Sequence, residues 1–226
     1  MKIKSYAHAS FRVEGGGKAI VTDPYEPAVA WFAPIDEPAD LVLMSSDTDR
    51  FHCDPSHVQG NPKVINTLTV PPEGMVVDGI PIRAFPARER FQMRLIFRGF
   101  RPRANAMYSF ELEGIKVFHT GDIGRRFRPD EIAALRGNVD VMIALSGGVH
   151  NIEVDDMKQA IDAIGPRMVI PMHYFNPKGR LKILPVDEIA KRFPADHVVR
   201  NGASEVEFTA ATLPKETTLY ILEPSR

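Results

Sequence analysis

The sequence predicts a single α/β domain, covering residues 1–226, with a first half made mainly of strands. With 226 residues, the chain is somewhat longer than a typical domain of roughly 150 residues, and no linker, repeat or change in composition divides it. Hydrophobic residues make up 44% of the chain and charged residues 25%, which argues against a disordered chain or a coiled coil. Short apolar runs dominate the first half, and runs with a helical period appear only in the second.

The first half is expected to contain several short strands. Residues 3–13 mix apolar and polar side chains as a strand does, the glycines at 15–17 form a turn, and residues 18–22 complete a hairpin. Residues 40–44 are almost continuously apolar, as in a strand buried on both faces. Further strands are expected over residues 63–66, 75–77, 80–85, 107–112 and 116–119, with a tight turn between the last two.

The second half alternates helices with buried strands. Residues 154–164 have a helical period of apolar side chains, and Gly165-Pro166 ends that helix. Two shorter helices are expected over residues 128–135 and 185–192. The 19 prolines of the chain favour such short elements. Strands are expected over residues 139–145, 168–172, 198–200, 205–208 and 218–222.

Charge and cysteine content exclude several classes of function. The 28 basic and 29 acidic residues give a net charge of −1, so no overall field attracts nucleic acid or an anionic membrane. The single cysteine, Cys53, excludes an intrachain disulfide framework and fits a reducing compartment. The N-terminal segment lacks the apolar core of a signal peptide, and no apolar stretch is long enough to span a membrane. We therefore expect a cytoplasmic protein without nucleic-acid or membrane partners.

Two histidines and an aspartate lie at the carboxyl ends of expected strands. His119 and Asp122 belong to the segment after residues 116–118, and His173 follows the strand over 168–172. Ligands of α/β folds gather at such strand ends, and imidazole and carboxylate groups act as metal ligands or as acids and bases. We expect Asp122, His173 and His119 to be catalytic residues of one site. Alternatively, Asp122 only shapes a turn and each histidine is a satisfied structural residue.

The loop after residues 40–44 holds two acids and a histidine within six residues. These are Asp47, Asp49 and His52, and the two carboxylates point the same way if the segment is extended. The alternative is an ordinary polar loop with Asx turns.

Arginine is concentrated in residues 83–103. This stretch contains seven arginines, with Phe91, Phe97 and Phe100 interleaved, and Glu89 is its one acid. Guanidinium groups suit the recognition of phosphate or carboxylate, which favours a small anionic molecule as the binding partner. The alternative is a solvated hairpin whose arginines pair with acids elsewhere.

Several short motifs follow one another along residues 1–176. The opening YAHASF contains His8, Thr22-Asp23-Pro24 forms a turn, FHTGD ends at Asp122, and the segment from Pro166 ends in VIPMHY. In this order they resemble the metallo-β-lactamase fold superfamily. They are most similar to its branch of small metal-dependent hydrolases that includes the L-ascorbate-6-phosphate lactonase-like proteins, which carry G-H-[AS], I-D-P, Y-H-[AT]-G-D and P-[KR]-x-V-I-P-M-H-Y.

The resemblance implies a four-layer αββα sandwich, in which two sheets face each other, helices lie outside, and a metal site occupies one sheet edge. The family holds two metal ions with an H-x-H-x-D-H loop, a histidine in an A-x-H turn, the aspartate of H-x-G-D and a late histidine, and the ions activate a hydroxide. H-x-H-x-D-H is absent here. When the preceding strand is aligned, Ser46, Thr48, Arg50 and Phe51 occupy its positions, and Glu89 is the one substitute in the A-x-H turn.

A shift by one residue restores part of the spacing of that loop. Asp47 and Asp49 then stand for the first two histidines and His52 for the last. With Glu89, Asp122 and His173 they make an oxygen-rich set, which suits Mn²⁺ or Mg²⁺ better than Zn²⁺. The other arrangement is a reorganised site without a catalytic metal. No tightly bound dinuclear zinc is expected in either case, whereas a single weakly held Mn, Mg or Zn ion is compatible with the sequence.

Two functions are compatible with this resemblance. In the first, the chain is a hydrolase homologue that acts on a small anionic ester or lactone, with its metal centre largely lost or rebuilt. In the second, it is a non-catalytic relative that binds an anion or a protein partner in the former cleft. In both, Arg50, Arg88, Glu89 and His8 are expected to contact the anion, with Arg50 near the former metal position. A homo-oligomer is compatible with both.

Overall fold

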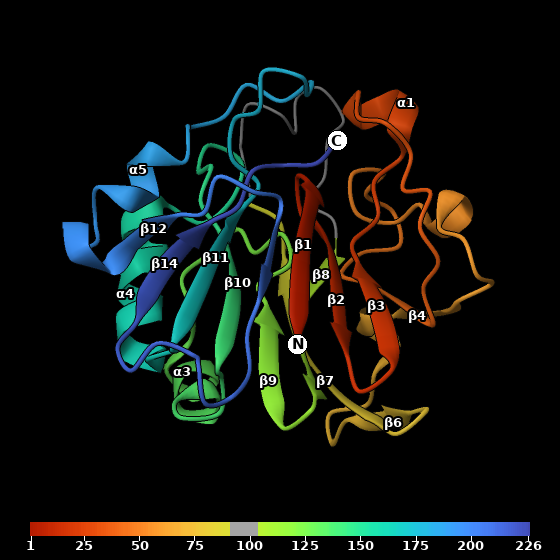
Figure 1. Cartoon of the computed structure of the whole chain (residues 1–226), viewed down its shortest axis with the longest axis horizontal. Coiled ribbons are helices and arrows are strands. Elements are labelled where there is room, and N and C mark those ends of the chain that lie inside the picture. Colours follow the sequence, from red (N-terminus) through yellow and green to blue (C-terminus); the bar gives the residue numbers. More distant parts are fainter. Residues whose placement is uncertain (91–103) are drawn as a thin grey trace.

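The computed structural model describes residues 1–90 and 104–226, and within them the strands form two facing sheets (Figure 1). The first sheet consists, in spatial order, of β13 (Glu205–Glu207), β1 (Lys2–Ala7), β2 (Ser10–Gly15), β3 (Lys18–Thr22), β4 (Leu41–Met44) and β5 (Lys63–Asn66). The second consists of β12 (Val198–Arg200), β14 (Thr218–Ile221), β11 (Met168–Met172), β10 (Val141–Leu145), β9 (Ile115–His119), β8 (Ala104–Leu112), β7 (Ile80–Arg88) and β6 (Met75–Val77).

Helices cover the outer faces of both sheets unequally. Among the described residues, the second sheet carries α3 (Pro129–Leu135), α4 (Val154–Ile164) and α5 (Asp187–Ala190), whereas α1 (Pro27–Ala30) lies on the side of the first sheet (Figure 1). Single 3₁₀ turns occur at Pro55–His57, Thr67–Thr69 and Ala195–His197. The expected α/β sandwich is therefore confirmed, with one outer layer made largely of loops. Prolines at positions 24, 27, 34 and 38 account for this, because proline interrupts helices.

The hydrophobic core lies between the sheets, and a smaller cluster covers the outer face of the first sheet. Successive side chains of a strand point to opposite faces. Leu41 and Leu43 of β4 accordingly join the core that both sheets share, whereas Val42 joins the outer cluster with Tyr25 and Phe32. The expectation that this strand is buried on both faces is confirmed.

Most expected elements are confirmed to within a few residues, but the expected strand over residues 3–13 is wrong. It is two strands, β1 and β2, because the chain turns at His8, whose φ of 57° lies in the left-handed region that few residues adopt outside turns. The helix expected over 185–192 is limited to Asp187–Ala190, between prolines 185 and 194.

Three contacts to backbone carbonyl oxygens join the two sheets at one end. The His173 amide donates to the His8 carbonyl oxygen (2.9 Å), and the Ala106 amide donates to that of Ser45 (2.8 Å). The Ala9 carbonyl oxygen lies 3.0 Å from His119 Nε2. These contacts fix the turn after β1 and the loop after β4 against the end of the second sheet. In the part of the chain that the structure describes, none of the helices is long and apolar enough to cross a bilayer.

Candidate metal centre

Five potential metal ligands meet where the two sheets are joined. His8 follows β1, Asp49 and His52 lie in the loop after β4, Asp122 follows β9, and His173 follows β11. One potential ligand atom each of His8, His52 and His173 lie within 4.8 Å of one another, and so do those of Asp49, His52 and Asp122. His52 belongs to both sets, so it is the centre of the cluster.

The buried carboxylate of Asp23 orients His52. Its Oδ2 lies 2.8 Å from His52 Nδ1 and accepts from the Ser45 hydroxyl (2.5 Å). Its Oδ1 accepts from the Ser45 amide (2.7 Å) and the Tyr108 hydroxyl (3.2 Å). Histidine ligands of metals commonly donate their second ring nitrogen to a carboxylate in this way. The arrangement leaves His52 Nε2 as the nitrogen that faces the cluster.

A tight turn shapes the loop that carries Asp49 and His52. The Ser46 hydroxyl accepts from the amides of Thr48 (3.3 Å) and Asp49 (3.2 Å). Asp49 in turn accepts from the Phe51 amide with its side chain (3.0 Å) and from the His52 amide with its carbonyl (2.7 Å). Ser46 therefore stabilises the conformation of the loop, because its hydroxyl is hydrogen-bonded to backbone groups.

Asp122 is held by two asparagines and a glycine turn. Its amide donates to Asn105 Oδ1 (3.0 Å), and Asn151 Nδ2 donates to its carboxylate. Gly121 has a φ of 54°, and a Cβ atom there would clash with the Ala106 carbonyl oxygen and with Asn105 Oδ1. Only glycine fits this approach without strain, and the close approach fixes the direction of the Asp122 side chain.

His173 faces the cluster from the opposite sheet. Its φ is 54°, and its carbonyl lies so close to Gly147 that a Cβ atom at that position would overlap it. Its Nε2 lies 3.6 Å from Asp122 Oδ1, which confirms the expected convergence of these two residues. Its ring centroid lies 4.1 Å from that of His8 and 6.0 Å from that of His52.

The electrostatics of the cluster favour a cation. Burial opposes the charged form of His52, but the hydrogen bond with Asp23 and the charges of Asp122, Asp23 and Asp49 outweigh it and raise the pKa to about 10. Burial, with the nearby charge of His52, lowers the pKa of His173 to about 3. Burial, His173 and His52 also lower the pKa of His8. Two imidazoles are therefore neutral and available as ligands.

Three buried nitrogens of the cluster have no hydrogen-bond partner among the described residues. They are His8 Nε2, His52 Nε2 and His173 Nδ1. Buried polar atoms are nearly always paired in folded proteins, and leaving one unpaired costs roughly 1–3 kcal/mol. A divalent metal ion coordinated by this cluster would satisfy such nitrogens, so the residues present fit a metal.

Two expected site residues lie outside this cluster. Asp47 is exposed and accepts from Asn66 Nδ2 (3.1 Å), because the loop turns at Ser46 and is not extended as the shifted alignment assumed. His119 was expected to be catalytic, but its Nε2 lies 3.0 Å from the Ala9 carbonyl and its Nδ1 accepts from the Gly121 amide (3.1 Å). Both ring nitrogens are thus hydrogen-bonded to backbone groups, and His119 stabilises the contact between the two sheets.

The residues expected to bind an anion occupy different positions around the cluster. The side chain of Arg50 is 63% exposed and pairs with Glu26, so it does not take the place of a metal ion. Arg88 is exposed at the end of β7, and its carbonyl accepts from the Gly124 amide (2.9 Å). Glu89 is buried, and its backbone packs against Gly124. His8 belongs to the donor cluster. Arg94, Arg98, Arg101 and Arg103 lie outside the described residues.

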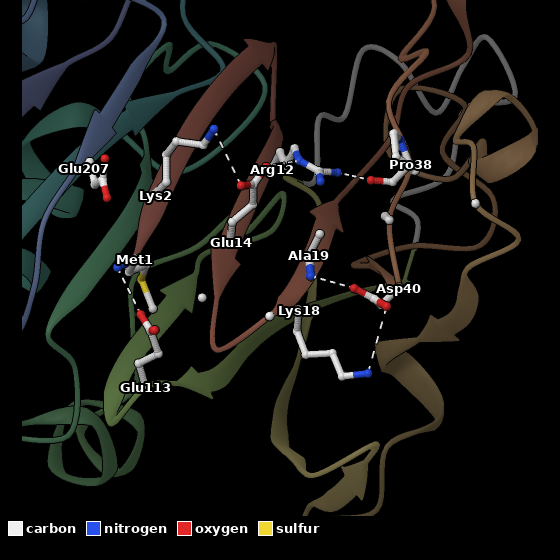
Figure 2. A pocket seen from close by; sticks show the side chains of 14 residues that line it. Met1, Lys2, Arg12, Glu14, Lys18, Ala19, Pro38, Asp40, Glu113 and Glu207 are labelled. Carbon is white, nitrogen blue, oxygen red and sulfur yellow. Dashed lines mark hydrogen bonds and ion pairs between the residues drawn. The ribbon is translucent and has the colours of Figure 1, made fainter.

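A separate depression of about 680 Å³ lies at the opposite end of β1, near the β2–β3 turn (Figure 2). Its charged side chains pair with one another. Lys2 lies 3.5 Å from Glu14, Lys18 lies 3.9 Å from Asp40, and the Met1 amino group lies 3.0 Å from Glu113. Because opposite charges neutralise each other there, we place the candidate site at the histidine cluster and not in this depression.

Asn105 and Asn151 were not among the site residues expected from the sequence. Asn151 follows the glycine-rich loop after β10, next to the end of β9, and the rule that ligands gather at strand ends could have found it. Asn105 lies near the start of β8 in a run of small residues, and no signal in the sequence marks it.

Comparisons with known proteins agree with the fold described above. The family model of the beta-lactamase superfamily domain matches residues 2–173. A UPF0173 metal-dependent hydrolase of Thermococcus onnurineus is 27% identical, over 77% of this chain and 84% of that protein. A crystal structure from Thermotoga maritima, assigned as a Zn-dependent hydrolase of the metallo-beta-lactamase superfamily, is 31% identical, covers 98% of both chains and has a TM-score of 0.75. A metallo hydrolase of Ignicoccus hospitalis, 17% identical over 100% of this chain and 96% of its own with a TM-score of 0.65, shares the fold.

Proposed function

The chain belongs to the metallo-beta-lactamase superfamily, and from this premise we propose that it is a metal-dependent hydrolase with a rebuilt metal centre. The observation that carries the proposal is the convergence of Asp49, His52 and Asp122 beside His173, with His52 oriented by Asp23. In this proposal Asp49 and His52 stand in for ligands of the missing H-x-H-x-D-H loop, whereas Asp47 takes no part. The similar proteins named as metal-dependent hydrolases support the same class of reaction.

The residues of the centre have distinct tasks in this proposal. Asp49, His52, Asp122 and His173 would hold a divalent ion, which would supply Lewis-acid polarisation of a carbonyl and activation of water. Asp23 keeps one His52 proton on Nδ1, so that Nε2 would present its lone pair once a bound metal ion displaced the second proton. The buried carboxylates of Asp49 and Asp122 can accept the proton that an attacking water gives up, since both face the same point.

We propose a small anionic ester or lactone as the substrate. Arg88 supports this choice, because its exposed side chain lies at the end of β7 and its backbone is bonded to the loop that follows Asp122. A guanidinium group there can hold a phosphate or carboxylate of the substrate with two parallel hydrogen bonds. Arg50 is a poorer candidate because Glu26 already engages its guanidinium.

The test combines metal analysis with hydrolysis of a substrate panel. Protein purified without chelator from metal-replete cells should contain bound divalent metal, and chelation should abolish the hydrolysis of phosphorylated or carboxylated lactones and esters. Asp49→Asn and Asp122→Asn should lose both properties, whereas Asp47→Asn, from the same loop, should keep them. Arg88→Ala should raise KM for anionic substrates more than for neutral analogues, and this difference should shrink at high salt.

Metal-free protein under these conditions would refute the proposal. If such protein still bound phosphate or a phosphorylated sugar, a non-catalytic anion-binding relative would be the better description. Equal activity of Arg88→Ala and wild type on all substrates would refute the anionic substrate class alone.

A further inference from the structure

His8 lies at the one place where a turn breaks the first expected strand. Because its φ is 57°, its side chain does not follow the alternation of side chains between the two faces of β1 and β2. The residue is partly exposed, but its Nε2 atom is buried and has no hydrogen-bond partner among the residues described. The ring of Phe51 lies with its centroid 5.3 Å from that of His8 and covers it.

The position of His8 relative to His173 is fixed by the backbone. The His173 amide donates to the His8 carbonyl oxygen over 2.9 Å, and both residues have a left-handed φ. Such backbone conformations cost roughly 1–3 kcal/mol and are retained mainly where function requires them. Here they turn the two imidazoles toward each other and toward His52, with ring centroids of His8 and His52 5.0 Å apart.

The two donor sets around His52 share this histidine. His52 Nδ1 is engaged by Asp23, so only Nε2 can bind a metal, and one nitrogen lone pair binds one ion. Both sets, His8–His52–His173 and Asp49–His52–Asp122, include this residue. The sets also approach each other directly, with 3.6 Å between His173 and Asp122.

We infer that His8 is a metal ligand and that the centre holds a single ion, bound by three imidazoles and two carboxylates. This inference rests on the proposed metal-dependent function and adds to it the third imidazole and the stoichiometry. A mixed set of imidazole and carboxylate ligands suits Mn²⁺, Fe²⁺, Co²⁺ or Zn²⁺. His8 thereby supplies, from the turn after β1, a ligand that the loop after β4 does not provide.

The test uses two replacements that tolerate the left-handed backbone. Asparagine and aspartate are among the residues most often found at positive φ, so His8→Asn and His8→Asp should both fold. Asparagine removes the imidazole, whereas aspartate offers a new anionic ligand. His197→Gln, at a partly exposed site that pairs with Glu216, is the matched histidine control.

The readouts are metal stoichiometry, Co²⁺ affinity by titration, and the visible absorption of bound Co²⁺. Wild type and the His197 variant should bind one ion per chain with the same spectrum. His8→Asn should bind Co²⁺ on the order of 100-fold more weakly, because even changes of groups that only orient a metal ligand can lower the affinity by that factor. His8→Asp should recover part of the affinity with an altered spectrum.

Two results would overturn the inference without touching the proposed function. One is two ions per wild-type chain, and the other is a His8→Asn variant that binds Co²⁺ with wild-type affinity and spectrum. If wild type binds no metal, the proposed function fails and the inference fails with it.

Discussion

Replacing Asp23 by asparagine tests the link between a buried carboxylate and the nitrogen that faces the metal. Oδ1 of Asp23 accepts from the Ser45 amide (2.7 Å) and the Tyr108 hydroxyl (3.2 Å), and an amide oxygen can keep both bonds. Oδ2 contacts the Ser45 hydroxyl (2.5 Å) and His52 Nδ1 (2.8 Å). An NH₂ group in that place can donate to the hydroxyl, which rotates, but it cannot accept from the imidazole.

The consequence for His52 is a change of tautomer. To keep a bond with the new amide, the imidazole must place its proton on Nε2, which removes the lone pair from the cluster. We expect the affinity for Zn²⁺ or Co²⁺ to fall about 10–100-fold, as for other changes of groups that orient a ligand. The metal-free protein should lose about 1–2 kcal/mol of stability, because a hydrogen bond to a charged carboxylate is replaced by a weaker one between neutral groups.

Metal titration and urea unfolding of chelator-treated protein measure the two effects separately. Asp78→Asn is the control, since Asp78 forms an ion pair with Lys63 at the surface and its loss should leave the metal affinity unchanged. If Asp23→Asn bound metal as tightly as wild type, then His52 would not be a ligand oriented by Asp23, and the assignment of the centre would be wrong.

Two further predictions concern the surroundings of the centre. Burial and the charges of Asp49, Asp47 and Asp54 raise the pKa of Cys53 to about 11, so its thiolate forms only as the pH approaches that value. Iodoacetamide should therefore label this single cysteine roughly 100-fold more slowly at pH 8 than a free thiol of pKa about 8.5; labelling at the free rate would contradict the burial. Gly121→Ala should lower the free energy of unfolding by at least about 2 kcal/mol, because it combines a positive φ with a backbone clash. Gly17→Ala, with a φ of 73° and nothing within 4 Å, should cost about 1 kcal/mol, and equal urea midpoints for the two variants would show that no clash exists.

Periodicity explains why most of the fold could be predicted from the sequence. The helix Val154–Ile164 was predicted at its observed bounds because its buried residues repeat at 3.6-residue intervals and Gly165 ends it. β4, β10 and β11 were recognised as continuous apolar runs, which strands covered on both faces require.

The turn at His8 could not be predicted, because no glycine or proline marks it. Tyr6, Ala7, Ala9 and Phe11 are all buried on either side of it, so the apolar pattern continues through the turn. Only tertiary contacts, such as the bond from His173 to the His8 carbonyl, show why the chain reverses there.

The candidate site was predicted in its location but only in part in its composition. The strand-end rule placed Asp122 and His173 together, and their side chains do meet. The expectation that Asp47 joins Asp49 in the site depended on an extended loop, and the hydrogen bonds to Ser46 make it a turn instead. The orientation of His119 depended on which face of β9 meets the turn after β1, which a single sequence does not reveal.

The joint between the sheets has a consequence for the order of folding. His8 and His173 lie near opposite ends of residues 1–176, so their contact closes a very long loop. Such long-range contacts are slow to form. An ion bound by both would act as a cross-link between the sheets that exists only in the finished structure. Metal at 100 times its dissociation constant would then stabilise the native state by about 2.7 kcal/mol and would slow unfolding more than it would speed folding.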